Sequence, residues 1–298
     1  MTSDCVLVLG GSGFVGSHVA DALLEAGYSV RIFDQKESPY IREGQEMIVG
    51  DVLDFDQVVA AADGVRYIYN FAGLADIDDA KHKPLETAQV NVIGNIHALQ
   101  AARDVDAERF LYASSVYVYS ATGSFYRASK QAGERFVEAF QQSLGLSYTI
   151  LRFGSLYGPR SDVRNGLYRI VRAALETGKV RYEGSPEALR EYIHVEDAAR
   201  ASVKALEPDF LNHHVVLTGQ EGMHVVDVLK MLAEIMGCPD AVEFVDVPQD
   251  GHYVRTPYAY QPKVGRKYVP SLHVDLGQGL LQLISEVQRE IDQVGESG

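Results

Sequence analysis

The chain has 298 residues, of which 46% are hydrophobic and 23% charged, an ordinary balance for a globular enzyme with a substantial core. Its formal net charge of -14 argues against a general nucleic-acid-binding or anionic-membrane surface. Two cysteines, Cys5 and Cys238, are too few for a disulfide framework, and no stretch is apolar for long enough to be a signal peptide or a membrane span. We therefore expect a reduced, cytoplasmic protein that binds neither nucleic acid nor membrane.

A glycine-rich turn follows the first expected strand. The apolar residues 6–9 lead directly into Gly10, and an amphipathic helix is expected over 17–26. The glycines are spaced G-x-x-G-x-x-G, one residue longer at the front than the most common dinucleotide fingerprint. Gly10 permits the tight turn, Gly13 lets backbone N–H groups approach a pyrophosphate, and Gly16 lets the helix pack closely on the strand. The pattern predicts a dinucleotide site, with an ordinary glycine-rich loop as the alternative.

An acidic residue follows the second expected strand, 29–33. Asp34 stands about 20 residues after the glycines, where a carboxylate accepts hydrogen bonds from the adenosine ribose hydroxyls. A carboxylate there would repel a 2′-phosphate, and neither Arg31 nor Lys36 replaces it as an NADP site requires. Asp34 therefore favours NAD over NADP, the alternative being a turn residue at a strand end.

Strands and helices alternate through the first half of the chain. Further strands are expected at 46–49, 65–69, 109–113 and 148–152, and long helices at 85–102 and 129–144. This order predicts an α/β fold, a doubly wound parallel (Rossmann) sheet whose ligands gather at the carboxyl ends of the strands. We assign 1–165 to a dinucleotide-binding domain and 166–298 mostly to a smaller substrate-binding lobe. The two are expected to interleave, because strands at 191–195 and 214–218 should return to the main sheet.

A tyrosine and a lysine four residues apart are the catalytic candidates. At the start of a helix, Tyr126 and Lys130 lie on one face, so that the ammonium group could stabilise the phenolate and lower the tyrosine pKa. Ser115, at the end of a central strand, could hold the reacting oxygen. The alternative is a Y-x-x-x-K sequence on an ordinary helix surface.

These motifs together resemble the extended short-chain dehydrogenase/reductases of the NAD-dependent sugar-nucleotide epimerase/dehydratase family, which includes UDP-glucose 4-epimerase. The resemblance covers the chain from its start to about residue 222 and is thin beyond that. The matching segments, in the family's order, are 10–16, Asp34, 51–52, 70–73, 113–115, 126–130, 151–160 and 190–197.

The resemblance implies NAD as the cofactor, a nucleoside-diphosphate sugar as the substrate, and no metal. Tyr126 would take a proton from a sugar hydroxyl, Lys130 would also hold the nicotinamide ribose, and Arg190 would contact the substrate diphosphate. The cofactor residues implied are Gly10, Gly13, Phe14, Val15, Gly16, Asp34, Asp51, Val52, Phe71, Ala72, Gly73, Tyr126, Lys130 and Phe153. The substrate residues implied are Ser115, Ser155, Arg160, Arg190 and Arg255. His194 and Asn91 are expected to be structural.

Three departures from the family pattern bear on the reaction. The link over 116–125 is short, where the family has a longer loop that helps to cover the sugar, and Ser155 replaces a common substrate-binding asparagine. Val116 and Tyr117 stand where 4,6-dehydratases carry an Asp-Glu pair, and decarboxylating members have a Glu at the position of Tyr117. Dehydration needs that additional acid and base. We therefore rank epimerisation above dehydration and decarboxylation.

The leading hypothesis is an epimerase acting at C4 of a nucleoside-diphosphate hexose through a transient keto sugar. One alternative is a dehydrogenase or reductase of a keto sugar or related alcohol that releases its cofactor after each turnover. Another is a non-catalytic NAD-binding protein, against which the intact Ser115, Tyr126 and Lys130 argue. The helices at 85–102 and 129–144 correspond to those that pair in family dimers, so that a homodimer is expected.

Overall fold

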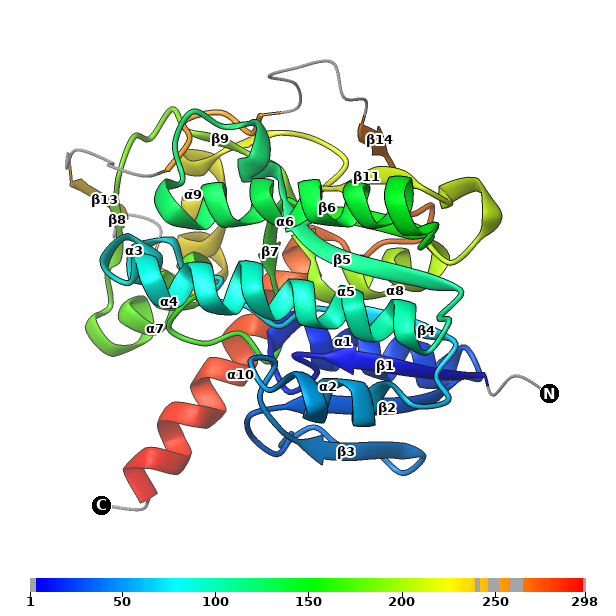
Figure 1. The fold of residues 1–298 in the computed structure, drawn as a ribbon. Helices are drawn as coiled ribbons and strands as arrows, with labels where there is room; N and C mark the ends of the chain where they lie inside the picture. The colour runs from blue at the N-terminus through cyan, green and yellow to red at the C-terminus, as the bar shows by residue number, and fades with distance from the viewer. Residues whose placement is uncertain (1–3, 239–241, 246–251, 258–264, 297–298) are drawn as a thin grey trace.

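The computed structural model describes residues 4–238, 242–245, 252–257 and 265–296. Its centre is an eight-stranded sheet in which all neighbouring strands are parallel (Figure 1). Across the sheet the strands are β14 (Gly265–Lys267), β11 (His213–Leu217), β6 (Tyr148–Phe153), β5 (Arg109–Ser115), β4 (Tyr67–Asn70), β1 (Cys5–Leu9), β2 (Ser29–Asp34) and β3 (Gln45–Val49). The order β3-β2-β1-β4-β5-β6 is that of doubly wound dinucleotide-binding folds. The predicted fold class is therefore confirmed.

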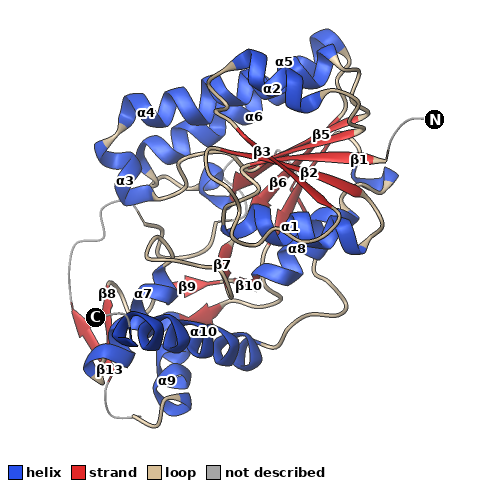
Figure 2. Cartoon of the chain, turned by 90° about the horizontal axis from the view of Figure 1, so that it is seen from below, coloured by secondary structure: helices blue, strands red, loops and turns tan. Residues whose placement is uncertain are grey.

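Helices cover both faces of this sheet (Figure 2). On one face lie α1 (Phe14–Glu25) and α8 (Val195–Lys204), and on the other α2 (Phe55–Ala62), α5 (Gly94–Asp104) and α6 (Ser124–Leu144). Strands β1 and β5 are buried along their whole length because neither face is open to water. A strand covered on both sides needs apolar residues at consecutive positions, which explains the continuous apolar runs in the sequence.

The two long helices expected from the sequence are present, with different boundaries. The stretch expected over 85–102 forms α4 (Pro84–Ala88), a π-helical turn η1 (Gln89–Ile93) and then α5. The helix expected over 129–144 is α6, which begins five residues earlier. A short helix, α3 (Ile77–His82), precedes α4 after the end of β4.

A smaller lobe is built from segments of the second half of the chain (Figure 2). Its helices are α7 (Gly166–Thr177), α9 (Val225–Ile235) and α10 (Leu276–Glu296). Its paired strands are β8 (Val180–Glu183) with β13 (Val242–Val245) and β9 (Leu189–Arg190) with β12 (Met223–His224). One apolar cluster joins the three helices, including Val171, Leu229 and Leu283.

One of the two strands expected to return to the main sheet does not do so. The stretch 191–195 forms β10 (Tyr192–His194), which pairs with β7 (Ser155–Tyr157) in a separate two-stranded sheet. The reason is that β11 pairs with β6 along its edge from Thr149 to Phe153, so that this edge is already occupied. The other expected strand, 214–218, is β11 and joins the main sheet as predicted.

Two short 3-10 turns, η2 (Val116–Tyr119) and η3 (Pro208–Phe210), complete the elements. Across the described ranges, no helix combines the length and apolar character that crossing a bilayer requires. The same residues contain no group of three or more His, Cys, Asp or Glu side chains arranged to hold a metal ion.

Candidate active site

The glycine-rich turn brings the end of β1 against the end of β4. Gly10 has φ 76°, and a Cβ atom there would lie 2.5 Å from the backbone nitrogen of Ala72. A Cβ at Gly16 would lie 2.2 Å from the carbonyl oxygen of Gly10. Both distances are far below van der Waals contact, so this geometry excludes any side chain. The turn consequently places the first turn of α1 at the carboxyl edge of the sheet.

The start of α1 is arranged for an anion. Gly13 is the N-cap and makes no side-chain capping hydrogen bond, and the first turn contains no acidic residue. The backbone N–H groups of that turn and the positive end of the helix dipole are therefore available to a phosphate. The closely packed glycines and the uncapped helix fit the pyrophosphate of a dinucleotide.

The carboxylate of Asp34 lies beside this turn. Its Oδ2 atom accepts a hydrogen bond of 3.0 Å from the backbone nitrogen of Ser12, and Ser12 Oγ donates to the carbonyl oxygen of Lys36 at 2.8 Å. The end of β2 is thereby joined to the glycine loop. A ribose next to the loop would meet a carboxylate, which accepts from its hydroxyls and repels a 2′-phosphate.

Other residues predicted to contact the cofactor lie around the neighbouring strand ends. Val52 is buried, and Asp51 Oδ1 accepts from the backbone nitrogen of Leu53 at 2.9 Å. Phe71 stacks against Tyr69 with ring planes 5° apart and also contacts Phe153. Asp51 and Val52 follow β3, Phe71 follows β4 and Phe153 ends β6, and the carboxyl ends of these strands meet at one edge of the parallel sheet.

Ser115, Tyr126 and Lys130 come together at this edge, as the sequence predicts. Ser115 ends β5, whereas Tyr126 and Lys130 lie on the first two turns of α6, and all three are buried. The side chains of Ser115 and Tyr126 are hydrogen-bonded. Lys130 Nζ donates to the carbonyl oxygen of Ala113 at 2.7 Å and lies 5.9 Å from the centroid of the Tyr126 ring.

The expected effect of the lysine on the tyrosine is not seen. Burial raises the pKa of Tyr126 to about 12, and the hydrogen bond from Ser115 offsets this only in part. Burial also lowers the pKa of Lys130 to about 8, against the opposing influence of the Glu134 carboxylate. Burial is thus the largest cause of both pKa shifts, and the ammonium group makes its hydrogen bond to the Ala113 carbonyl.

A buried ion pair fixes α6 against the strands. Arg152 donates to both carboxylate oxygens of Glu134, at 2.9 Å from Nε and 2.6 Å from Nη2. Ser114 Oγ donates to Glu134 Oε1 at 2.5 Å, so that the residue next to Ser115 is held by the same carboxylate. A second tie is the buried amide of Asn91, which donates to Ser129 Oγ at 2.9 Å.

The residues predicted to bind substrate fall into two groups. Arg190 is buried at the end of β9, with Ser155 at the start of β7 and Arg255 exposed in the segment 252–257 beside β9. Arg160 departs from the prediction that it joins them. Its Nη2 atom is paired with Asp21 Oδ2 of α1 at 2.7 Å, and its guanidinium lies 4.5 Å over the Tyr40 ring. Arg160 thus links α1 to the lobe instead of facing Arg190.

Tyr117 lies next to Tyr126, and two further aromatic residues, His252 and Tyr253, lie next to Tyr117. Tyr117 has its ring centroid 6.1 Å from that of Tyr126 and 4.6 Å from that of Tyr253. The Tyr117 hydroxyl shares a hydrogen bond of 2.8 Å with His252 Nδ1. The sequence distinguishes Tyr117 only by its difference from the dehydratase pattern, and no periodicity distinguishes His252 or Tyr253.

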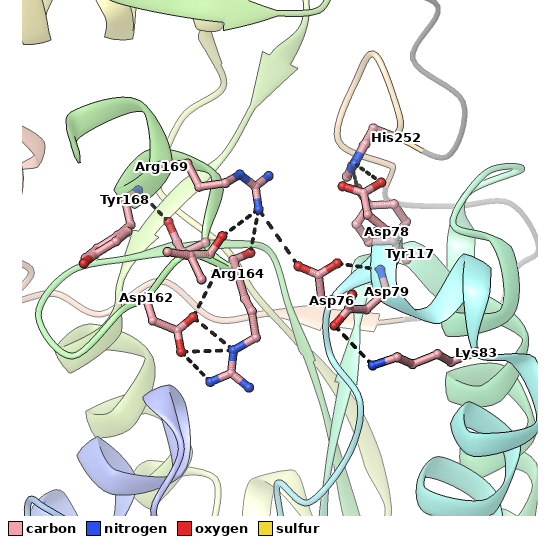
Figure 3. Close-up of polar contacts among 12 residues, drawn as sticks. Asp76, Asp78, Asp79, Lys83, Tyr117, Asp162, Arg164, Tyr168, Arg169 and His252 are labelled. Carbon is pink, nitrogen blue, oxygen red and sulfur yellow. Dashed lines mark hydrogen bonds and ion pairs between the residues drawn. The ribbon is translucent and has the colours of Figure 1, made fainter. Parts of the chain in front are cut away.

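Two polar contacts join α3 and its N-cap residue to the lobe (Figure 3). His252 Nε2 is 3.8 Å from Asp78 Oδ1, and Arg169 Nη1 of α7 is 3.9 Å from Asp76 Oδ2. Both pairs are long and partly exposed, so each contributes about 0–1 kcal/mol. They join the segment that follows Gly73 to the lobe across the catalytic edge of the sheet.

Comparison with known proteins gives a consistent result. The sequence model of the NAD dependent epimerase/dehydratase family matches residues 6–218. A putative UDP-glucose 4-epimerase of Methanocaldococcus jannaschii is 26% identical over 94% of this chain and 97% of its own length. The UDP-glucose 4-epimerase of Thermus thermophilus, solved with NAD, superposes with a TM-score of 0.80 at 25% identity and covers 95% of this chain and 99% of that one. The Thermotoga maritima UDP-glucose 4-epimerase, solved with UDP-glucose, gives a TM-score of 0.83 at 24% identity, covering 96% and 99%.

Proposed function

Because the chain belongs to the NAD-dependent epimerase/dehydratase family, we propose that it is an NAD-dependent epimerase that inverts C4 of a UDP-hexose. The observation that carries the proposal is the meeting of Ser115, Tyr126 and Lys130 beside the glycine-rich turn. The choice of UDP as the nucleotide and of C4 as the reacting carbon rests on the names of similar proteins.

Each residue of the site has a separate role in the proposed reaction. Bound at the glycine-rich turn, NAD would supply reversible hydride transfer. Tyr126 Oη takes the proton of the reacting sugar hydroxyl and later gives it back, while Ser115 Oγ orients that oxygen. Lys130 would hold the nicotinamide ribose and supply positive charge next to Tyr126. Arg190 pairs with the diphosphate, whose charge its planar guanidinium suits.

The protonation state of Tyr126 sets a requirement on this mechanism. A phenol whose pKa is about 12 is almost wholly protonated at neutral pH. Proton removal therefore needs cationic charge brought to the phenol oxygen, which stabilises the phenolate. Lys130 would supply this charge by leaving the Ala113 carbonyl when the ribose hydroxyls bind.

Epimerisation is favoured over dehydration and decarboxylation by the surroundings of Tyr126. Tyr117 stands where those reactions place a carboxylic acid, and its hydroxyl is bonded to His252. Burial keeps the pKa of Tyr117 well above its ordinary value, so this phenol is a poor acid–base group at neutral pH.

A homodimer is proposed on the basis of one helical surface. Helices α4, α5 and α6 lie on the same face of the sheet (Figure 2), and α4, η1 and α6 carry exposed large apolar side chains. These are Leu85, Ile93, Phe125, Phe136 and Leu144. Burying such a surface against a second copy would give an isologous interface. The free thiols of Cys5 and Cys238 are consistent with a reduced, cytoplasmic setting, which we also propose.

The first experiment is an incubation of purified protein, without added cofactor, with a panel of UDP-, dTDP-, GDP- and CDP-sugars. Proton NMR follows the sugars and nicotinamide absorbance follows the cofactor. Conversion of one UDP-hexose to its C4 epimer without net NADH is expected. Turnover that requires added NAD(H) would instead identify a dehydrogenase or reductase, and light scattering of the same sample tests the dimer.

A further inference from the structure

The short segment 252–257 is attached to the strand that carries Arg190. The backbone nitrogen of Leu189 donates to the carbonyl oxygen of Val254 at 2.7 Å, and that of Thr256 donates to the carbonyl oxygen of Leu189 at 3.1 Å. Thr256 Oγ1 also accepts from the backbone nitrogen of Glu191 at 3.2 Å. These bonds set the register of the segment along β9, and they place Tyr253 next to Arg190.

The Tyr253 side chain contacts several of the residues proposed to act on substrate. The guanidinium carbon of Arg190 lies 4.4 Å from the centroid of the Tyr253 ring. The Tyr253 hydroxyl is 3.3 Å from Ser155 Oγ, within hydrogen-bond distance. Its ring also lies 4.6 Å from that of Tyr117, which in turn contacts Tyr126. Tyr253 is only 7% exposed, so these contacts are desolvated.

We propose that Tyr253 is a positioning residue, which holds Arg190 for the diphosphate and Ser155 for the sugar of the bound substrate. The proposal rests on the function proposed above and deepens it. It assigns to the lobe a residue that connects the phosphate-binding and sugar-binding sides of the site.

The geometry of Arg190 supports this role. Its Nη1 donates to the carbonyl oxygens of Leu189 at 3.2 Å and Val254 at 3.1 Å, while the guanidinium packs over the Tyr253 ring. Among the described residues nothing accepts a hydrogen bond from its Nε or Nη2. One side of the planar group is thus anchored and the other is left for phosphate oxygens, which suits bidentate pairing. A fixed guanidinium loses less conformational entropy when the diphosphate binds.

The neighbouring residue His252, which Figure 3 shows beside Tyr117 and Asp78, ties Tyr253 to the catalytic end of the site. His252 bonds the Tyr117 hydroxyl and faces Asp78 of α3. The segment is therefore held at Tyr117 on one side and at β9 on the other. This double attachment fixes the distance between Arg190 and the group around Tyr126.

The test compares two substitutions of Tyr253 by their effect on the binding of UDP alone, measured by calorimetry. Tyr253→Leu removes both the ring and the hydroxyl, and we expect the Kd of UDP to rise about tenfold, as the loss of a desolvated cation–π contact predicts. KM for the UDP-hexose should rise in parallel, while the amount of bound NAD stays as in the wild type. Tyr253→Phe keeps the ring, so UDP should bind as in the wild type, with kcat reduced through the lost contact with Ser155.

Tyr67→Leu is a matched control. Tyr67 is also buried and also lies beneath an arginine, with Arg66 at 5.0 Å from its ring centroid, but it stands at the start of β4, the opposite end of the strand from the site. It should lower Tm without changing the Kd of UDP. The proposal is overturned if Tyr253→Leu leaves the Kd of UDP unchanged, or tightens binding as removal of an obstruction would. A wild-type protein that neither binds UDP nor converts any UDP-sugar would refute the proposed function itself.

Discussion

Lys130 Nζ lies 5.9 Å from the centroid of the Tyr126 ring, and both side chains are buried. An ammonium group in such surroundings destabilises the fold wherever it remains charged. Its pKa in the folded protein is about 8, against an ordinary value of 10.5. The free energy of unfolding therefore decreases as the pH falls from about 10.5 to about 8, and the full destabilisation is present below pH 8.

The first prediction concerns the stability cost of this lysine. Lys130→Met should increase the free energy of unfolding at pH 7 by about 1–3 kcal/mol while abolishing epimerisation. The gain should shrink as the pH rises through 8 towards 10.5, because the wild-type lysine then becomes neutral. Urea unfolding of both proteins across this pH range checks the prediction. A pH-independent difference would show that burial of charge is not its cause.

The second prediction concerns the proton transfer. Tyr126→Phe should reduce kcat by about a hundredfold or more, since general acid–base groups contribute effects of that order. The ring and its packing on Tyr117 are retained, so Tm and the amount of bound NAD should match the wild type. Steady-state kinetics and cofactor content after denaturation measure these quantities. Near-normal turnover would exclude Tyr126 as the acid–base group.

The third prediction concerns the ion pair below the catalytic residues. Glu134→Gln leaves the buried guanidinium of Arg152 without its bidentate partner, which should destabilise the protein by about 3–5 kcal/mol. The exposed pair of Arg172 and Glu176, at 2.9 Å, provides the control. Glu176→Gln should change stability by less than about 1 kcal/mol. Equal losses of stability in the two variants would show that burial does not determine the cost of removing the carboxylate.

The fourth prediction concerns the cofactor turn. Gly16→Ala places a Cβ 2.2 Å from the Gly10 carbonyl oxygen, so the variant should purify without NAD and with a lower Tm. At Gly166, the first residue of α7, an added Cβ meets nothing within 4 Å. Gly166→Ala should therefore behave as the wild type. Normal NAD content in Gly16→Ala would mean that the turn can relax further than its packing indicates.

The sequence predicts best those parts of the molecule that depend on local geometry. Gly10, Gly16 and Asp34 act within one turn and two adjacent strands, and the structure places them where the spacing requires. The π-helical turn around Asn91 was not predicted, because an extra residue in one helical turn leaves the apolar pattern almost unchanged. The position of β10 depends on competition for the edge of β6, which no local pattern records.

The aromatic residues of the site show more clearly that local sequence patterns do not record contacts between distant parts of the chain. Tyr253 and Ser155 are separated by 98 residues, and Tyr117 and His252 by 135. Their meeting depends on how the lobe closes against the sheet, not on spacing along the chain. The raised pKa of Tyr126 is likewise not evident from the sequence, because the spacing of the lysine does not reveal which carbonyl its ammonium group bonds.

The position of β11 at the edge of β6 also affects how the chain folds during its synthesis. During synthesis β6 emerges well before its partner, because residues 154–212, 59 in all, separate the two strands. Until β11 arrives, one edge of β6 has no strand to pair with and is prone to associate with other chains. The nascent first half therefore cannot reach its final form on the ribosome alone, and a fragment of residues 1–165 is expected to aggregate.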